Sequence, residues 1–285
     1  MKATSDHPYR GRSAALLTQH GKERLIAPVF QTLLDCRVER VDGYDTDLLG
    51  TFTREIPRPG SQLEAARRKA RVGMTLSGLP LGIASEGSFG PHPILGMCPW
   101  NVELLVWIDD LQGVEVVGRA QGSGNFAHAM VRDWTAAESF ARRVLFPEHF
   151  MVLRPEREDD PRIRKGICSW SELETEFAQV LEQSSTGDVF LEIDVRAHAN
   201  PTRQENIRLA AEDLAARLRS PCPACDAPGF WLVERIPGLP CADCGATTGE
   251  PTADLLGCVR CPHRVTRQRT DRTSADPARC DYCNP

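Results

Sequence analysis

The sequence predicts an α/β domain with a mixed sheet, followed by a small cysteine-rich domain. Over residues 12–153, short apolar runs alternate with segments whose apolar residues recur at helical spacing. The composition then changes at Ser220, and eight of the eleven cysteines lie between residues 222 and 283. These observations place the domain boundary between residues 1–219 and 220–285.

Spacing and turn residues give the order of the expected elements. Apolar runs of about four to eight residues bounded by turn signals predict strands at residues 13–18, 37–41, 79–84, 102–108 and 189–195. Apolar residues at helical spacing predict helices at residues 25–34, 62–77, 133–145, 171–182 and from Thr202 to about Leu218. Ser61 with Glu64, and Thr202 with Glu205, have the spacing of a capping box, which marks a helix start.

Glycine, proline and charge runs predict the loops. Two prolines and a glycine make residues 56–61 a loop, and residues 85–93 read as a second glycine- and proline-rich loop. Residues 154–164 carry charges and prolines without periodicity, which indicates an exposed loop or hinge. Asp45 and Asp47 are interpreted as turn formers.

Composition narrows the classes of protein. The chain has 285 residues, 41% hydrophobic and 26% charged, which is typical of a globular protein with a buried core. No apolar run approaches the roughly 20 residues that span a bilayer, so a cytoplasmic protein without a membrane segment is expected. The formal charge of −5 disfavours binding of a polyanion by the whole chain, but it is compatible with a local basic patch.

The cysteines of the C-terminal part form four Cys-x-x-Cys units: Cys222/Cys225, Cys241/Cys244, Cys258/Cys261 and Cys280/Cys283. Each unit supplies two sulfurs from one tight turn, and two units complete a tetrahedral Cys₄ shell, so two structural zinc sites are expected. Disulfides or free thiols are the alternative. The units can pair in order or interleave, and the strand-like residues 230–235 and 264–269 slightly favour an interleaved zinc ribbon.

The ribbon also contains a basic stretch. Residues 260–272 hold five arginines and one acid, and alternate arginines on a strand share one face. A solvated ribbon strand is one interpretation, and docking on nucleic acid or protein is the other. Eight arginines and eight acids over residues 219–285 show that the ribbon as a whole is not basic.

Three segments of the larger domain contain residues suited to phosphate or metal chemistry. Thr18 to Lys22 is a polar turn before a helix, where backbone N–H groups and a lysine can hold phosphate. Glu64 and Glu86 are carboxylates delivered from a helix and from an expected strand end, and such a pair can share Mg²⁺. Local structure also explains Glu64, because it is the last residue of the capping box.

Together these segments resemble the inosine triphosphate pyrophosphatase superfamily. The resemblance covers roughly residues 14–95 and rests on Leu17-Thr-Gln-His-Gly-Lys22, Glu64-Ala-Ala-Arg-Arg-Lys-Ala-Arg71, Gly78-Leu-Pro-Leu81 and Ser85-Glu86-Gly87. It implies a nucleotide-pyrophosphatase-like mixed α/β fold and Mg²⁺-dependent hydrolysis of non-standard nucleoside triphosphates. By motif position, Lys22 would contact phosphate with the Thr18 turn, and Glu64 and Glu86 would hold the metal.

There are two further resemblances, one to the same superfamily and one to a different family. The segment from Arg196 to Arg203 is the analogue of a base-reading motif, which makes His198 and Arg203 candidate substrate-binding residues. The whole chain, with Glu86 to Pro93 and the four-unit cysteine tail, also resembles a bacterial family with no assigned function.

Two functions are therefore expected as alternatives. The first is a magnesium-dependent nucleoside triphosphate pyrophosphohydrolase with catalytic Lys22, Glu64 and Glu86 and a structural zinc ribbon. The second is a non-enzymatic module that binds a nucleotide, a nucleic acid or a protein through the ribbon, with Arg264, Arg267 and Arg269 as contacts. Dependence of turnover on Mg²⁺ and Glu86 would distinguish the first from the second.

Overall fold

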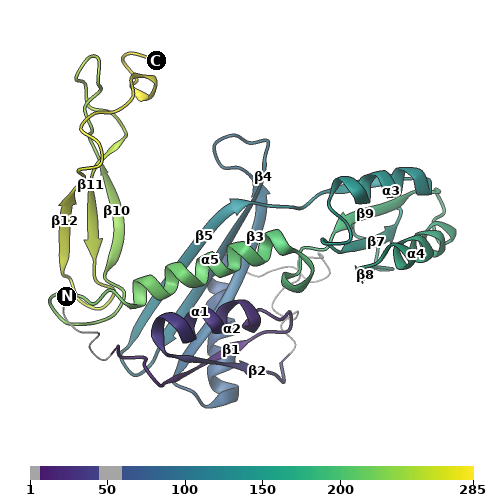
Figure 1. The fold of residues 1–285 in the computed structure, drawn as a ribbon, viewed down its shortest axis with the longest axis horizontal. Coiled ribbons are helices and arrows are strands. Elements are labelled where there is room, and N and C mark those ends of the chain that lie inside the picture. The colour runs from purple at the N-terminus through teal and green to yellow at the C-terminus, as the bar shows by residue number, and fades with distance from the viewer. Residues whose placement is uncertain (1–6, 45–59) are drawn as a thin grey trace. The chain divides into compact units, whose positions relative to one another are not determined.

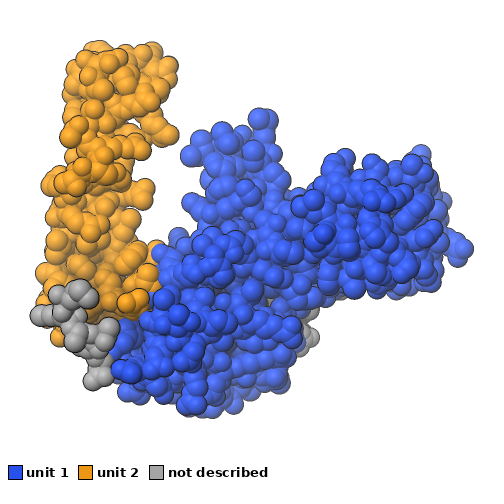
Figure 2. Space-filling model, in the orientation of Figure 1, with its two compact units in different colours: residues 1–111, 117–215 blue, residues 112–116, 216–285 orange. Residues whose placement is uncertain are grey.

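The computed structural model describes residues 7–44 and 60–285. The chain divides into two compact units, coloured separately in Figure 2. The first unit contains residues 1–111 and 117–215, and the second contains residues 112–116 and 216–285. The expected turn at Asp45 and Asp47, and most of the expected loop at 56–61, lie outside the described residues.

A five-stranded mixed sheet forms the centre of the first unit, in the order β2-β1-β3-β4-β5 (Figure 1). β1 is parallel to both β2 and β3, and β4 is antiparallel to β3. The strands are β1 (Ser13–Leu17), β2 (Arg37–Val41), β3 (Leu81–Pro91), β4 (Pro99–Asp109) and β5 (Val114–Ser123). The predicted mixed α/β fold is confirmed.

Helices α1 (Glu23–Leu34) and α2 (Gln62–Ser77) cover opposite faces of this sheet. Val106 and Ile108 of β4 share a buried cluster with Ala66, Ala70 and Met74 of α2. Trp107, between them in sequence, stacks instead on Phe30 of α1 at 5.6 Å between ring centroids. Since successive side chains of a strand point to opposite faces, α1 and α2 lie on different sides.

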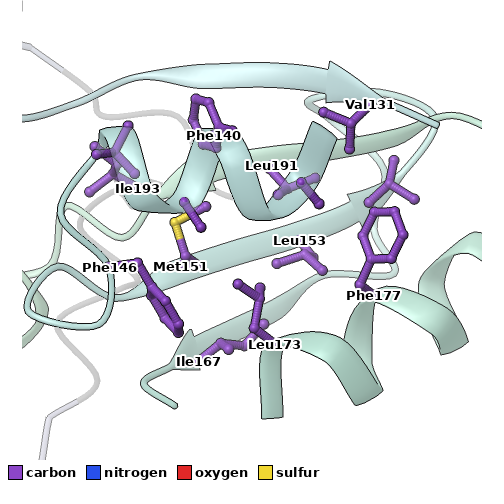
Figure 3. Packing of buried hydrophobic residues seen from close by; sticks show 14 of the residues in the cluster. Val131, Phe140, Phe146, Met151, Leu153, Ile167, Leu173, Phe177, Leu191 and Ile193 are labelled. Atoms are coloured by element: carbon purple, nitrogen blue, oxygen red, sulfur yellow. The ribbon is translucent and has the colours of Figure 1, made fainter. Parts of the chain in front are cut away.

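A second sheet in the first unit has four strands, in the order β6-β9-β7-β8. Its elements are β6 (His128–Val131), α3 (Trp134–Arg143), β7 (Met151–Pro155), β8 (Arg164–Ile167), α4 (Trp170–Glu182) and β9 (Val189–Ile193). Figure 3 shows its core, where Phe140 of α3 and Leu173 and Phe177 of α4 lie over Met151 and Leu153 of β7. The sheet therefore has its own apolar core.

The expected loop at residues 85–93 is wrong over most of its length, because β3 continues to Pro91. Gly87 and Gly90 lie inside this strand and are paired with β4. A Cβ at Gly87 would lie 2.1 Å from Glu103 Oε1 and 2.6 Å from Arg203 Nη2. This glycine marks a close approach of side chains and not a turn.

Two other expectations also need correction. The last helix, α5 (Pro201–Leu218), begins before Thr202, because Asn200 Oδ1 accepts a hydrogen bond from the Arg203 N–H and caps it. Pro201 then occupies the first helical position, where a missing N–H costs nothing. The loop expected at residues 154–164 is shorter than predicted, because residues 154–155 belong to β7 and Arg164 belongs to β8.

The second unit is a three-stranded antiparallel sheet with two cysteine-bearing ends. The strands are β10 (Trp231–Pro237), β11 (Pro251–Gly257) and β12 (Arg264–Gln268), in that order. The expected strands at 230–235 and 264–269 correspond to β10 and β12, and β11 was not expected. None of the helices in the described ranges has the length and apolar character that crossing a bilayer requires.

Candidate active site and two cysteine tetrads

The candidate active site lies at the carboxyl end of β1. From β1 the chain passes through α1 to β2 on one side, and β3 pairs with β1 on the other side. This is a topological switch point, where parallel sheets leave a crevice for ligands beyond the strand ends. Thr18 is buried directly after β1, and Lys22 lies at the start of α1.

Lys22 is a buried lysine with neutral hydrogen-bond partners. The Lys22 Nζ donates to the Ser85 carbonyl oxygen at 2.6 Å and lies 3.4 Å from Ser85 Oγ. In the described part of the chain its ammonium forms no ion pair. Burial, with a smaller contribution from the nearby charge of Arg203, lowers the pKa of Lys22 to about 7, although the charges of Glu86 and Glu103 oppose this shift. Lys22 therefore carries a proton that it can lose near neutral pH.

Glu86 lies inside β3 and not at a strand end, which corrects the expectation from sequence. Its side chain is 2% exposed and forms a short ion pair with Lys69 of α2. The side chain of Ser85 and the Cα of Gly87 face the opposite side of β3, toward Lys22 and Arg203 respectively. The strand therefore presents a carboxylate on the α2 side and neutral groups on the α1 side.

Glu64 does not join this cluster. It is exposed, and its Oε2 accepts the Ser61 N–H at 2.7 Å and the Ser61 hydroxyl at 2.9 Å. The capping box predicted at Ser61 and Glu64 is confirmed in both directions. The same helix reaches the site through Gln62, whose amide donates to the Glu86 carbonyl oxygen at 2.7 Å.

A buried ion pair lies under the site. Arg203 Nε donates to Glu103 Oε1 at 2.8 Å, and Arg203 Nη1 donates to the Val195 carbonyl oxygen at 2.6 Å. The side chains are 1% and 0% exposed. Asn101 also donates to Glu103 Oε1, at 3.1 Å, and Asn206 donates to Asn101. Arg203 therefore contributes to the site by holding the Glu103 carboxylate in place.

His20 and His198 extend the cluster at its edge. Their ring centroids are 5.5 Å apart. Burial, together with the neighbouring Lys22, His198, Arg196 and Arg203, lowers the pKa of His20 to about 3. Burial also lowers the pKa of His198. Both rings are therefore neutral at physiological pH and can act as hydrogen-bonding groups.

Of the six site residues proposed for the larger domain, the structure brings Lys22, His198 and Arg203 together on the α1 side of β3, with Thr18 at the end of β1. The side chain of Glu86 lies on the α2 side of the same strand. Glu64 remains apart on the outer face of α2. Sequence reasoning missed Lys69 and Glu103. Lys69 belongs to the sequence motif on α2, five positions after Glu64, but the sequence did not show that its side chain faces Glu86. Glu103 lay in an apolar run, and a lone acid in such a run was the available signal.

The eight clustered cysteines form two tetrads. Cys222 and Cys225 meet Cys258 and Cys261, and Cys241 and Cys244 meet Cys280 and Cys283. The first unit of the sequence pattern pairs with the third and the second with the fourth, so the interleaved arrangement is confirmed. Within each tetrad all sulfurs lie within 4.8 Å of one another. Among the described residues these are the two groups of three or more potential ligands that converge in this way.

The spacing of the sulfurs fits zinc. Four Sγ pairs across the tetrads are 3.6–3.8 Å apart, far beyond a disulfide bond, and the cysteines are free. A tetrahedral zinc with Zn–S bonds of about 2.3 Å requires sulfurs about 3.8 Å apart. A backbone hydrogen bond from Ala227 lowers the pKa of Cys225 to about 6, and those from Cys244 and Asp243 lower the pKa of Cys241 to about 7. Burial and the neighbouring thiols raise the pKa of Cys261 and Cys283 to about 12, so these two thiols would lose their protons to the metal itself. Each tetrad can hold one zinc in this way.

Local backbone conformation explains two of the four turns, those of Cys222/Cys225 and Cys241/Cys244. The residue after the second cysteine has a left-handed φ in each case, +55° at Asp226 and +73° at Gly245. Its N–H donates back to the carbonyl oxygen of the first cysteine, from Asp226 to Cys222 at 2.9 Å and from Gly245 to Cys241 at 3.0 Å. The chain therefore folds back so that both sulfurs of each turn face the same point.

The arginines of the basic strand β12, and Arg269 directly after it, have partners within the second unit. Arg264 Nη1 donates to the carbonyl oxygens of Cys258 and His263, at 3.1 and 3.0 Å. Arg267 pairs with Asp254, and Arg269 pairs with Asp271 at 2.6 Å. The three arginines proposed as nucleic-acid contacts are thus each engaged within the second unit.

The fold and its sites define a class of protein: a mixed α/β domain with a buried charged cluster, joined to a ribbon with two cysteine tetrads. The chain belongs to the family described as Domain of unknown function (DUF6671), whose model matches residues 69–285. The matched range includes Glu86, Glu103, Arg203 and both tetrads. No curated protein and no solved structure matches the chain.

Proposed function

We propose that the first unit binds a nucleoside triphosphate and hydrolyses it to the monophosphate and pyrophosphate. The observation that supports this best is Lys22, a buried ammonium at the switch point whose hydrogen bonds go to neutral groups of Ser85. A buried cation without a carboxylate partner is costly, and a phosphate oxygen would supply the missing charge. Helix α1, which begins beside it, adds backbone N–H groups.

The surrounding charges are consistent with an anionic ligand. Lys22, Lys69 and Arg203 supply three positive charges against the carboxylates of Glu86 and Glu103. In the proposed reaction, water forms a new bond to the α-phosphorus and the bond from phosphorus to the pyrophosphate oxygen breaks. Glu86, once it leaves its ion pair with Lys69 and reaches the edge of β3 where Lys22 lies, takes the proton of the attacking water, and Lys22 stabilises the charge that develops on the phosphate oxygens.

The residues do not form a magnesium site in their present arrangement. Glu86 pairs with Lys69, and Glu64 is engaged with Ser61 on an exposed helix start. Holding Mg²⁺ between them, as the superfamily resemblance implies, requires Glu64 to leave its capping box. The proposed hydrolysis therefore rests on carboxylate assistance, and its dependence on Mg²⁺ is part of the test.

The test is pyrophosphate release from a panel of standard and deaminated nucleoside triphosphates by the zinc-loaded full chain, with and without Mg²⁺. Lys22→Met and Glu86→Gln are expected to lower turnover by at least a hundredfold, in the range of general-base and electrostatic contributions of about 10²–10³. Glu192→Gln is the matched control, because Glu192 is also an ion-paired carboxylate, bonded to Arg154 in the other sheet.

The control variant should retain turnover, with circular dichroism confirming that all variants fold. Absence of release from every triphosphate by the folded wild-type chain would overturn the hydrolase proposal. Nucleotide binding is measured separately by equilibrium dialysis. Loss of that binding in Lys22→Met, without turnover in the wild type, would identify a nucleotide-binding domain that is not an enzyme.

A further inference from the structure

A second charged site lies in the second unit, and one of its residues directly precedes a cysteine of the second tetrad. A cavity of about 380 Å³ opens between the end of β10, the start of β11 and the segment after β12. Four of its lining residues are arginines, Arg235, Arg269, Arg272 and Arg279. Glu250 is the one acidic residue of the lining.

The backbone around Gly238 shapes this cavity. Gly238 has a φ of +126°, in the region that favours glycine, and its N–H is shared by the carbonyl oxygens of Thr248 and Glu250. The Leu239 N–H also donates to the Glu250 carbonyl oxygen, at 3.0 Å. Leu239 is 4% exposed and forms an apolar part of the wall. The cavity is thus formed by fixed backbone and not by mobile side chains alone.

The cysteine tetrad nearby fixes one of the arginines. Arg279 lies in the 3₁₀ helix η3 (Pro277–Arg279), directly before the ligand Cys280. The Cys280 N–H donates to the Pro277 carbonyl oxygen at 3.1 Å, which closes that turn. Zinc on the second tetrad would therefore hold Arg279 at the cavity.

The cavity has an excess of positive charge. Glu250 contacts two of the arginines, with Oε1 3.1 Å from Arg279 and Oε2 3.6 Å from Arg272. Arg269 pairs with Asp271 just outside the lining, and Asp254 pairs with Arg267 on the neighbouring strand. With these neighbours included, five guanidinium groups face three carboxylates. Two positive charges are left without compensation.

Arg235 is the lining arginine without an ion pair, although Asp254 lies opposite it in the register of β10 and β11. Its guanidinium forms no ion pair or hydrogen bond with any residue of the described ranges, and the side chain is exposed at the cavity. A planar guanidinium offers two parallel N–H donors, a geometry that matches two oxygens of a phosphate group. The lining contains no aromatic ring, so the cavity has nothing on which a base can stack.

We propose that this cavity binds a phosphate group through Arg235, Arg279 and Arg272, with Glu250 holding two of these guanidinium groups in place. The phosphate can belong to a free polyphosphate or to the backbone of a nucleic acid, because the cavity recognises the group and not the base. This site is independent of the one proposed for the first unit.

The experiment titrates the zinc-loaded full chain with two probes. Inorganic tripolyphosphate is followed by calorimetry, and a fluorescein-labelled single-stranded DNA of mixed sequence is followed by anisotropy at several salt concentrations. Arg235→Gln is compared with Arg219→Gln, a matched control. Arg219 is an exposed arginine of the same unit, outside the cavity and without a partner among the described residues.

Arg235→Gln is expected to weaken binding of the recognised probe by about tenfold at low salt and to lower the salt slope by about one. Arg219→Gln should change the affinity by less than twofold. The same comparison in a Lys22→Met background removes any contribution of the first unit. Binding of tripolyphosphate identifies a free phosphate ligand, and binding of DNA alone identifies a nucleic-acid backbone.

Two results would overturn the proposal. One is failure of the wild-type chain to bind either probe. The other is an equal effect of Arg235→Gln and Arg219→Gln, which would show a response to net charge and not to the cavity. If Lys22→Met abolishes turnover but leaves probe binding unchanged, the phosphate site of the second unit is independent of the site in the first unit.

Discussion

Glu103 and Arg203 are 100 residues apart in sequence and form a buried ion pair with an N–O distance of 2.8 Å. Glu103 comes from β4, and Arg203 comes from the first turn of α5. The pair lies against Gly87 of β3, on the same face as Lys22. It connects three elements of the first unit directly beneath the proposed phosphate site.

Breaking this pair on one side should cost more than removing it entirely. Arg203→Met leaves the Glu103 carboxylate buried without its cation, and a loss of about 3–5 kcal/mol in the free energy of unfolding is expected. Urea denaturation measures it. The double variant Glu103→Gln/Arg203→Met should recover part of the loss. A double variant as unstable as the sum of the two single variants would show that the groups do not interact.

Glycine is required at position 87 but not at position 90 of the same strand. Gly87→Ala places a Cβ within 2.1 Å of Glu103 Oε1, whereas a Cβ at Gly90 meets nothing within 4 Å. We expect Gly87→Ala to destabilise the first unit by about 1–3 kcal/mol and Gly90→Ala to have a much smaller effect. Thermal unfolding compares them. Similar shifts in the two variants would contradict the close approach seen here.

The buried Lys22 should make stability depend on pH. Its pKa is lowered to about 7 in the folded chain from 10.5, so between these values the unfolded state binds more protons. The contribution of Lys22 to the free energy of unfolding therefore rises as pH increases from about 7 to about 10.5, and is most unfavourable below 7. Lys22→Met should remove this rise. Identical pH profiles for the two proteins would argue against a lowered pKa.

Phosphate binding at the Lys22 site should weaken as pH rises, which is opposite to the pH dependence of stability. A bound phosphate favours the protonated lysine, so nucleotide affinity is expected to fall as pH rises above about 7, by up to tenfold per pH unit. Equilibrium dialysis between pH 6 and 9 measures this. The profile should flatten in Lys22→Met, and a wild-type profile that is already flat would exclude Lys22 as the phosphate contact.

Zinc content tests the two tetrads separately. Elemental analysis of the wild-type chain should give about two zinc ions per chain. Cys258→Ser and Cys280→Ser change different tetrads, so each should lower the content to about one. Cys98→Ser is the control, because Cys98 is an exposed free thiol outside both tetrads. A zinc-free wild type with intact thiols would rule out the metal sites.

Glu64 allows its capping role to be separated from a role in metal binding. Glutamine can replace glutamate in a capping box, so Glu64→Gln should leave the free energy of unfolding nearly unchanged, while Ser61→Ala should cost about 1 kcal/mol. If Glu64→Gln also leaves turnover unchanged, Glu64 acts in helix capping alone. A selective loss of Mg²⁺-dependent turnover with unchanged stability would assign it to the metal.

The parts of the fold that follow from local chemistry could be predicted from the sequence. Ser61 and Glu64 fixed the start of α2 because a capping box is satisfied within one helical turn. The Cys-x-x-Cys spacing fixed four metal-binding turns for the same reason, since both sulfurs of each turn come from one short loop. Strands β1 and β2 were also recognisable from their apolar runs between turn residues.

The remaining features depend on groups that are distant in sequence. Gly87 resembled a turn residue until its neighbours Glu103 and Arg203 were known, and Glu86 was placed in a loop because the pairing of β3 with β4 was not visible. The interleaved tetrads and the arginine cavity likewise depend on which strands pair. Local patterns therefore determined the helices, some of the strands and the ligand types of this protein. Tertiary structure decided which charges meet, because burial and opposing partners are supplied by other parts of the chain.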